Sequence, residues 1–410
     1  MKLDKETTFA VPLEQKPEHE SVGSEILSLL KGNIREYAMY IALVVIFVIF
    51  TIATNGLFLS PRNLINLVNQ TGYVAVLAIG MTLILIIKHI DLAVGFVAGF
   101  LGAVAAILLM NGMNVWLVIP IVLCCGALIG AYQGFLVTVI KVPAFVTTLA
   151  GMFMFRGLLS LVTAGTGTII VRDRTFLQLS NGFIPDLPWG DRLEFHLLTL
   201  LIGVFLVAAM IYSQIKSRRS MQRYNFKTSS PVIFGIKLIM LTALIMGITW
   251  IMASYRGLPW TAVIVTVVLL IYNFILTKTR FGRHIYAIGG NTEAAELSGI
   301  KVRRVTFLVF SSMGLLSALA GILYTSRLAS ATPTAGLGFE LDAIASSYIG
   351  GVSVSGGVGR VTNTIIGALV IMSLTNGMNL LGVDISFQYV VKGLIFILAV
   401  AFDVTTGSRR

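Results

Sequence analysis

The sequence predicts an all-α membrane protein, a polytopic bundle of transmembrane helices with about twelve crossings of the bilayer. Of its 410 residues, 56% are hydrophobic and only 12% are charged, against about 25% charged residues in a soluble domain. The mean hydropathy is +0.90, and apolar runs near the roughly 20 residues that a transmembrane helix needs recur along the chain. The 40 glycines fit the same class, because membrane helices approach each other closely through small residues.

Apolar runs predict where the crossings lie, and one of them is interrupted. The stretch at 341–359 contains paired glycines and serines, so we expect it to be a broken or re-entrant segment. A polar stretch at 164–195, whose charges nearly cancel, is expected outside the cell. The uninterrupted runs lie at 37–54, 64–87, 92–110, 115–140, 145–163, 197–212, 232–253, 260–276, 306–324, 364–381 and 387–402.

Basic residues in the short segments between the runs predict the orientation. An excess of Lys and Arg marks cytoplasmic loops, and Lys31 and Arg35 come just before the first run. An internal N-terminus puts the basic loop 213–230 inside, and twelve crossings also put the C-terminal arginines inside. A re-entrant broken segment would instead move that end outside. The expected organisation is a cytoplasmic tail at 1–36, a transmembrane domain at 37–403 with a cytoplasmic loop at 277–305, and a cytoplasmic tail at 404–410.

Several function classes find no support in the sequence. The net charge of +12 does not indicate a nucleic-acid partner, because loop charge beside membrane spans explains it. The chain has no G-x-x-x-x-G-K-S/T loop for ATP, no G-x-S-x-G nucleophile elbow and no H-E-x-x-H metal site. Cys124 and Cys125 are adjacent within an apolar run, where we expect ordinary core residues. We therefore expect no catalytic residue, no metal site and no cofactor.

Four of the ionisable residues within or beside the apolar runs, Asp91, Arg156, Glu340 and Asp342, are candidates for a polar path, because such groups usually face a polar cavity or a partner. Asp91 follows His89 between the second and third runs and belongs either to a polar break or to an ordinary turn. Arg156 lies about 18 Å into its run, at 1.5 Å per residue. We expect Arg156 to pair with Asp91, Glu340 or Asp342, or alternatively to extend to the membrane interface.

The loop after the eighth run predicts a short helix. Asn291 is a favourable N-cap, Glu293 suits the positive end of a helix, and Gly299 is a natural stop. An isolated helix of two turns is marginal in water. We therefore expect it to dock, either on the spans of its own chain or on another protein.

Five stretches resemble the permease subunits of bacterial ABC importers for monosaccharides, the ribose, xylose and galactose group. Ala93 stands where the family's IDLSVG motif has serine, and the extra length at 213–258 is similar to the xylose and multiple-monosaccharide branch. The stretches are 89–95 (HIDLAVG), 141–157 (KVPAFVTTLAGMFMFRG), 281–300, 339–359 (FELDAIASSYIGGVSVSGGVG) and Asn376-Gly377-Met378.

The resemblance implies a path for a pentose or hexose of the xylose, arabinose, galactose or glucose class, driven by ATP hydrolysis on a partner. It implies an ABC ATPase subunit, an extracytoplasmic sugar-binding protein, a second permease copy in a homodimer, and a bacterial inner membrane. Asp91, Arg156, Glu340 and Asp342 would border the path. The segment coupled to the ATPase would comprise Gly289, Gly290, Asn291, Glu293, Ala294, Ala295, Leu297, Ser298 and Gly299.

Two alternatives stay open at this point. The first is a self-sufficient secondary carrier or facilitator for a small polar solute, which the scarcity of intramembrane carboxylates disfavours. The second is a membrane-bound enzyme, which the missing nucleophile, metal and phosphate motifs disfavour.

Overall fold

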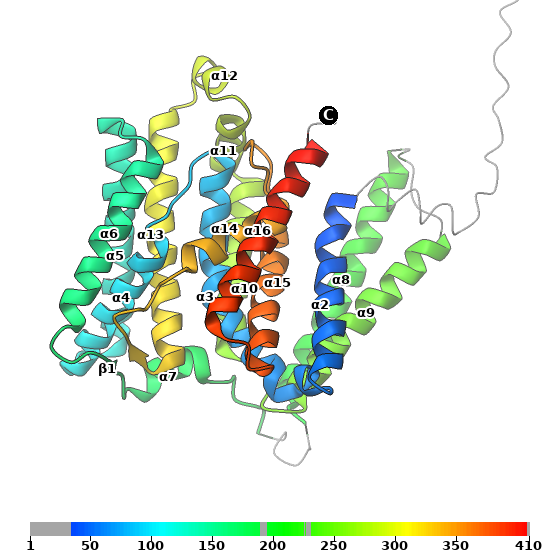
Figure 1. Ribbon diagram of the computed structural model, residues 1–410. Helices are drawn as coiled ribbons and strands as arrows, with labels where there is room; N and C mark the ends of the chain where they lie inside the picture. Colours follow the sequence, from blue (N-terminus) through cyan, green and yellow to red (C-terminus); the bar gives the residue numbers. More distant parts are fainter. Residues whose placement is uncertain (1–33, 189–194, 225, 227–230, 408–410) are drawn as a thin grey trace, which may run out of the picture.

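A computed structural model describes residues 34–188, 195–224, 226 and 231–407, so most of the expected tail at 1–36 lies outside the described residues. Figure 1 shows long helices side by side in one bundle. The helices are α2 (Ile34–Ala53), η1 (Leu57–Leu59), α3 (Pro61–Ile86), α4 (Val94–Met110), α5 (Val115–Phe135), η2 (Leu136–Ile140), α6 (Ala144–Thr163), α7 (Arg174–Asn181), α8 (Leu197–Arg223), α9 (Pro231–Ala253), α10 (Trp260–Lys278), α11 (Arg280–Gly290), α12 (Thr292–Leu297), α13 (Val302–Leu328), α14 (Phe339–Ile349), α15 (Val361–Leu380) and α16 (Ile385–Gly407). Two short strands, β1 (Ile169–Ile170) and β2 (Ser330–Ala331), pair antiparallel.

The predicted number of crossings agrees with the helices. Eight helices in the described part of the chain are long and apolar enough to span a membrane, and α2, α4 and α16 contain shorter apolar helices. With α14 as a partial crossing, they make up the predicted twelve. The segment that includes α14 crosses the bundle rather than turning back: β2 pairs with β1 at one end, while Gly357 donates to the Ile86 carbonyl at the end of α3.

Two crossings are interrupted, so the prediction of a single broken segment is incomplete. Both α4 and α14 begin near mid-height, and non-helical chain completes each crossing (Figure 1). The sequence predicted a run at 92–110, which α4 confirms, with Asp91 in either a polar break or a turn before it, and an interrupted stretch at 341–359. The structure places the non-helical segments at 87–93, before α4, and on both sides of α14, at 332–338 and 350–360. Ionisable residues interrupt the first segment, and the second contains Pro333 and two glycines with positive φ, which end regular helix.

The basic residues expected in the loop 213–230 lie mostly on a helix, because α8 continues to Arg223. Lys, Arg and Gln are good helix formers, so the polar sequence prolongs the span instead of ending it.

We name the two ends of the bundle by their short helices. The α12 end also carries the start of α2 and the end of α16, and the α7 end lies opposite (Figure 1).

The interrupted crossings belong to two segments of the same build. α3 has 26 residues and α13 has 27, and each is followed by non-helical chain and then by a shorter helix, α4 of 17 residues and α14 of 11. The two long helices run in opposite directions across the bundle (Figure 1). Inverted repeats with discontinuous helices are a recurring plan of membrane transporters. The acidic residues Asp91 and Glu340 therefore lie at comparable places, beside the first turns of α4 and α14.

α3 and α13 form the centre of the bundle. Every residue of α3 from Thr71 to Ile86 is buried, and α13 packs on α3, α4 and α5. Small residues allow the closest approaches: a Cβ at Gly130 would collide with the Phe310 carbonyl, and one at Gly321 would collide with the Ala98 carbonyl. Close backbone contact of this kind gives membrane helices the packing that hydrophobic exclusion cannot supply between them.

The hairpin of α8 and α9 contacts the remainder of the bundle at its α7 end. Asp186 accepts backbone hydrogen bonds from Leu198 at 2.8 Å and Leu197 at 2.9 Å, which hold the start of α8. Partial burial raises the pKa of Asp186, but these bonds and the one from Leu187 outweigh it and leave the pKa below its usual value. Toward the α12 end the two helices stand away from the bundle (Figure 1).

A reciprocal amide pair joins α3 to α15, and its loss should lower stability. Asn63 donates to Asn376 at 2.9 Å, and Asn376 donates back at 3.1 Å, with both side chains buried. We expect Asn376→Leu to cost about 1–3 kcal/mol, because it leaves a buried amide short of a partner. Thermal unfolding in detergent checks this, with Thr375→Ala as control because that hydroxyl bonds only to its own helix. Equal unfolding temperatures for the two variants would contradict the assignment.

Candidate functional site: a polar break and a coupling segment

The half-helices α4 and α14 meet through their first turns. A Cβ at Gly95 would collide with the Gly336 carbonyl and with the Glu340 carboxylate, and a Cβ at Gly99 would collide with the Ala335 carbonyl. The two N-terminal ends, each carrying partial positive charge, therefore face one another inside the bundle. Polar backbone groups outside regular helix therefore lie at membrane depth. Such groups are tolerated there where the chain is enclosed by protein or lines a cavity.

Asp91 organises the start of α4. It is buried, and its Oδ1 accepts a hydrogen bond of 2.9 Å from the Ala93 backbone. Thr148 of α6 donates to the carbonyl of Ile90 at 3.3 Å, which fixes the extended segment against the neighbouring helix. Asp91 therefore belongs to a built polar break and not to an exposed turn.

The position where the family's motif has serine faces protein. Ala93 is only 1% exposed, and a Cβ at Gly151 of α6 would lie 3.2 Å from the Ala93 Cβ and 2.7 Å from Nε2 of Gln133. That Nε2 is buried and has no hydrogen-bond partner among the described residues. The hydroxyl that a serine would carry at this position would therefore lie in the packing between α4, α5 and α6.

Glu340 and Asp342 lie in the first turn of α14, where the helix dipole favours negative charge. Both are buried. Asp342 forms an ion pair with Lys392 of α16, with Nζ at 2.9 Å from Oδ1 and 3.1 Å from Oδ2. Oε2 of Glu340 has no hydrogen-bond partner among the described residues. The start of α14 therefore holds one carboxylate with a cationic partner and one carboxyl group with an unbonded oxygen.

The expected pairing of Arg156 with a carboxylate is wrong for the described part of this single chain. Lys392 occupies the position beside Asp342, and the Arg156 guanidinium lies 5.7 Å from the ring centroid of Phe96. Arg156 is exposed on α6, which allows its long side chain to lie along the apolar surface. It nevertheless reaches the level of the polar break, because Phe96 adjoins Gly95.

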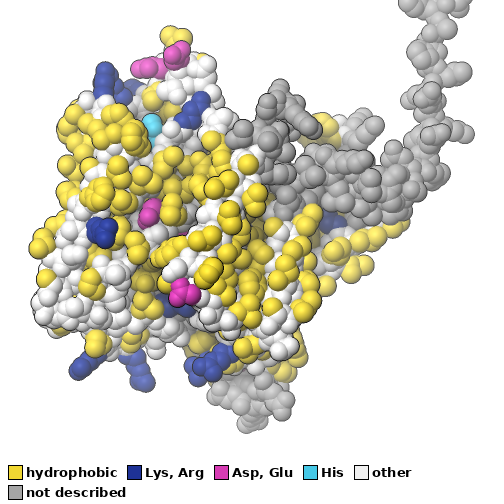
Figure 2. Space-filling view, in the orientation of Figure 1, with side chains coloured by type: hydrophobic (Ala, Val, Ile, Leu, Met, Phe, Trp, Pro, Cys, Tyr) yellow, Lys and Arg dark blue, Asp and Glu magenta, His cyan; other side chains and the backbone are white. Residues whose placement is uncertain are grey.

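The short helix expected after the eighth run is α12, and its caps are confirmed. Oδ1 of Asn291 accepts from the Ala294 backbone at 3.0 Å, Glu293 lies in the first turn, and Gly299 follows with a φ of +82°. Docking on its own spans is slight, since Leu297 is 91% exposed and Ala295 is the buried residue of this helix. Figure 2 shows acidic and hydrophobic side chains exposed together at this tip.

A junction of backbone contacts connects this tip to the polar break before α4 and to the loop after α14. A Cβ at Gly289, near the end of α11, would collide with the Ile86 carbonyl and lie 2.6 Å from the Gly357 nitrogen. Gly357 donates to the Ile86 carbonyl at 2.9 Å, and Lys88 Nζ donates to the Gly290 carbonyl at 3.2 Å. We call these five residues, Ile86, Lys88, Gly289, Gly290 and Gly357, the glycine junction.

The glycine junction links three segments that the sequence left separate. Ile86 ends α3 and leads into the break that contains Asp91, while Gly357 lies in the loop after α14. The Tyr286 hydroxyl of α11 adds a bond of 2.7 Å to the Gly359 carbonyl. Sequence reasoning identified the tip but missed Lys88, Tyr286, Gly357 and Lys392. Lys88 stands at the end of an apolar run, which is common to many interfaces. Lys392 lies within the run 387–402, where an ionisable residue is itself a signal.

Comparison with known proteins assigns the chain to a family. The family described as "Branched-chain amino acid transport system / permease component" matches residues 63–400. The xylose transport system permease protein XylH of Escherichia coli is 39% identical over 378 residues, covering 92% of this chain and 93% of the relative. XylH of Haemophilus influenzae is 38% identical over 390 residues, covering 94% and 100%.

A ribose permease is also similar. The ribose import permease protein RbsC of Escherichia coli is 34% identical over 362 residues, covering 88% of this chain and 91% of the relative. No solved structure matches. These matches cover most of the chain. The chain therefore belongs to this permease family, among the permeases of monosaccharide ABC importers.

Proposed function

We propose that this chain forms the translocation path for a monosaccharide of the xylose, arabinose, galactose or glucose class. A separate ABC ATPase subunit binds α12 and drives the cycle. The observation that carries the proposal is the exposed tip: a six-residue helix presents Leu297 to solvent at the end of a membrane bundle. An exposed large apolar side chain on a helix too short to be stable alone supports a protein partner at that place.

The α12 end is the cytoplasmic end in this proposal. Its basic residues support this orientation, because short cytoplasmic loops carry an excess of Lys and Arg. An ATPase in the cytoplasm then reaches α12, and an extracytoplasmic sugar-binding protein delivers sugar to the α7 end. α16 ends on the same side as α12 (Figure 1). The basic residues near α12 are Lys278, Arg280, Arg283, Lys301, Arg303 and Arg304.

A second copy of the chain completes the path in this proposal. Arg156 supports it: a guanidinium exposed on the apolar flank of α6 at the level of the polar break is costly in lipid. A homodimer in the inner membrane would cover this flank and leave Asp91, Arg156, Glu340 and Asp342 around one shared passage. Lipid covers the remaining apolar surface.

Movement of α12 reaches the path through the glycine junction. The ATPase displaces α11 and α12, the displacement moves Ile86 and Gly357, and the segment before α4 and the loop after α14 follow. The half-helices rearrange as units because they are held by close backbone contacts at Gly95 and Gly336. The sugar itself moves passively, since the chain contributes no group that reacts with it.

Replacing Leu297 tests the proposed ATPase contact. We expect Leu297→Asp to reduce recovery of the ATPase subunit with the tagged permease at least tenfold. The aspartate would put an unpaired charge into the apolar centre of the contact, where single anchors commonly contribute about 2 kcal/mol or more. The permease itself should express and unfold normally, because the side chain touches little of its own chain. Leu59→Asp at the α7 end, also an exposed leucine, is the matched control. Recovery of the ATPase with both variants as with the wild type would contradict the proposed contact.

A further inference from the structure

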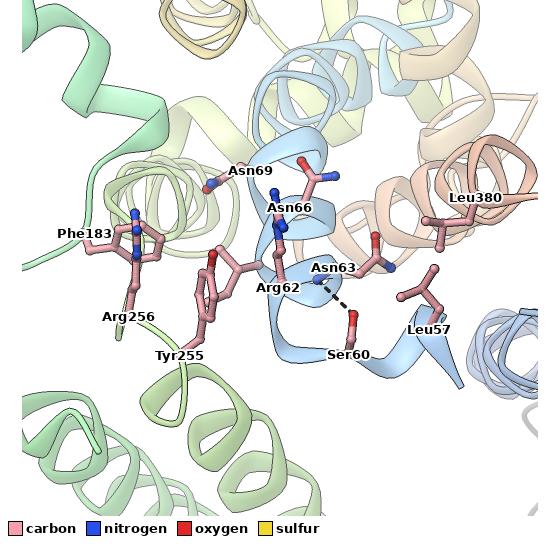
Figure 3. Close-up of a pocket in the computed structure, with 11 residues that line it drawn as sticks. Leu57, Ser60, Arg62, Asn63, Asn66, Asn69, Phe183, Tyr255, Arg256 and Leu380 are labelled. Atoms are coloured by element: carbon pink, nitrogen blue, oxygen red, sulfur yellow. Dashed lines mark hydrogen bonds between the residues drawn. The ribbon is translucent and has the colours of Figure 1, made fainter. Parts of the chain in front are cut away.

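A cavity of about 530 Å³ opens at the α7 end, between the start of α3 and the turn that joins α9 to α10. Figure 3 shows polar side chains from α3 facing Tyr255, Arg256 and Phe183 across this hollow. It is separate from the polar break and from the α12 tip. The residues that line it are Leu57, Ser60, Arg62, Asn63, Ile65, Asn66, Asn69, Phe183, Tyr255, Arg256 and Leu380.

The lining is cationic and rich in hydrogen-bonding groups. Arg62 and Arg256 contribute two guanidinium groups, and no Asp or Glu is among the described lining residues. Arg256 lies 5.9 Å from the ring centroid of Phe183 and 5.6 Å from that of Tyr255, so its side chain is oriented by aromatic faces and not by a carboxylate. Two such groups fit a phosphate diester, which arginine binds in a forked geometry.

Asn69 supplies an independent sign of a ligand. Its side chain is 8% exposed, it lines the cavity, and its Oδ1 has no hydrogen-bond partner among the described residues. An unpaired buried acceptor is costly, and a hydroxyl donor on a bound molecule would satisfy it. The cavity therefore fits an anionic group that also carries hydroxyls.

The depth of the site places it in the headgroup layer of a membrane. α3 has 26 residues, which makes it about 39 Å long at 1.5 Å per residue. This exceeds the roughly 30 Å hydrocarbon core, and the polar residues 62, 63, 66 and 69 show that the excess lies at the α7 end. Beside the cavity, the α8–α9 hairpin stands away from the bundle and exposes apolar residues, including Phe205 and Ile239.

We propose that this cavity binds the headgroup of an anionic phospholipid of the phosphatidylglycerol type, whose acyl chains lie between the hairpin and α2–α3. Arg62 and Arg256 hold the phosphate near the surface, and the headgroup glycerol bends inward into the cavity, where one of its hydroxyls donates to Asn69. An acidic side chain of a docked protein fits less well: Asn69 lies about 12 Å along α3 from its first residue, deeper than a short carboxylate reaches from the surface.

Lipid titration of the delipidated full-length protein in detergent tests the site. Short-chain phosphatidylglycerol should bind saturably, and phosphatidylcholine of equal chain length should bind at least tenfold more weakly. The double variant Arg62→Gln with Arg256→Gln should lose at least tenfold in affinity for phosphatidylglycerol. Arg174→Gln, which removes an exposed arginine of the same end outside the cavity, should stay within twofold of the wild type.

Asn69→Leu adds a second, chemically selective arm. It should weaken phosphatidylglycerol binding severalfold but leave phosphatidylmethanol unchanged, because that phosphodiester has no hydroxyl for Asn69 to accept. Glycerol 3-phosphate alone should bind weakly; binding as tight as that of the lipid would identify a site for free phosphate compounds and overturn the proposal.

Two further results would overturn it. One is equal affinity of the wild type for phosphatidylglycerol and phosphatidylcholine, which needs no variant to fold. The other is unchanged lipid affinity in the double variant together with lost binding of the sugar-binding protein, which would assign the cavity to protein docking. None of these binding measurements uses sugar uptake, so their outcome is independent of the proposed transport function.

Discussion

Gly289→Val is expected to lower ATP-driven sugar uptake at least tenfold while leaving the permease in the membrane. The new side chain would collide with the Ile86 carbonyl and crowd the Gly357 nitrogen, so α11 must separate from the end of α3. Overpacking of this kind costs about 1–3 kcal/mol, which a bundle of this size tolerates. The loss should therefore appear as uptake that no longer follows ATP hydrolysis, measured in proteoliposomes with both partners present.

Gly290→Ala is the matched control for this variant. It lies next in the chain, a Cβ there meets nothing within 4 Å, and the carbonyl that accepts from Lys88 is retained. Uptake should stay near the wild-type rate. Normal coupling in Gly289→Val would show that the glycine junction does not transmit movement, whereas equal losses in both variants would point to a general defect of this loop.

Lys392→Met is expected to destabilise the permease by about 3–5 kcal/mol, because it leaves the buried Asp342 carboxylate without its cation. The variant should unfold at a much lower temperature and accumulate poorly in membranes. Lys278→Met, which removes an exposed lysine in the last turn of α10, should unfold as the wild type does.

The double variant Lys392→Met with Asp342→Asn separates charge from packing. Replacing both members of a buried ion pair is often close to neutral, so most of the lost stability should return. Uptake should stay low if the pair positions the start of α14 in the path. A double variant as unstable as Lys392→Met would show that the ion pair is not the cause.

Sequence reasoning located what local chemistry determines. The cap at Asn291 and the stop at Gly299 are properties of a few neighbouring residues, and α12 forms between them. Hydropathy likewise located the crossings, because span length reflects bilayer thickness. The apolar run at 92–110 matches α4, and the polar residues before it marked the first break. The turns at 332–338 were missed, because hydropathy does not distinguish helix from enclosed irregular chain.

Long-range partners could not be predicted in the same way. Asp342 meets Lys392 from 50 residues away. Arg156 and Lys392 are each the one charged residue of their apolar runs, so the sequence alone does not select between them. The contact of Gly289 with Ile86 and Gly357 joins three distant segments through backbone atoms, which leave no signature in side-chain pattern. Such contacts follow from helix packing, and that depends on the whole bundle.

Uptake of labelled xylose into proteoliposomes tests the central claim most directly. The permease would be reconstituted with its ATPase subunit and sugar-binding protein, with ATP available to the ATPase. The proposed function predicts uptake that requires all three proteins and ATP, persists when ionophores abolish ion gradients, and falls with Leu297→Asp. Uptake by the permease alone along a proton or sodium gradient, unaffected by ATP, would contradict it and identify a self-sufficient carrier.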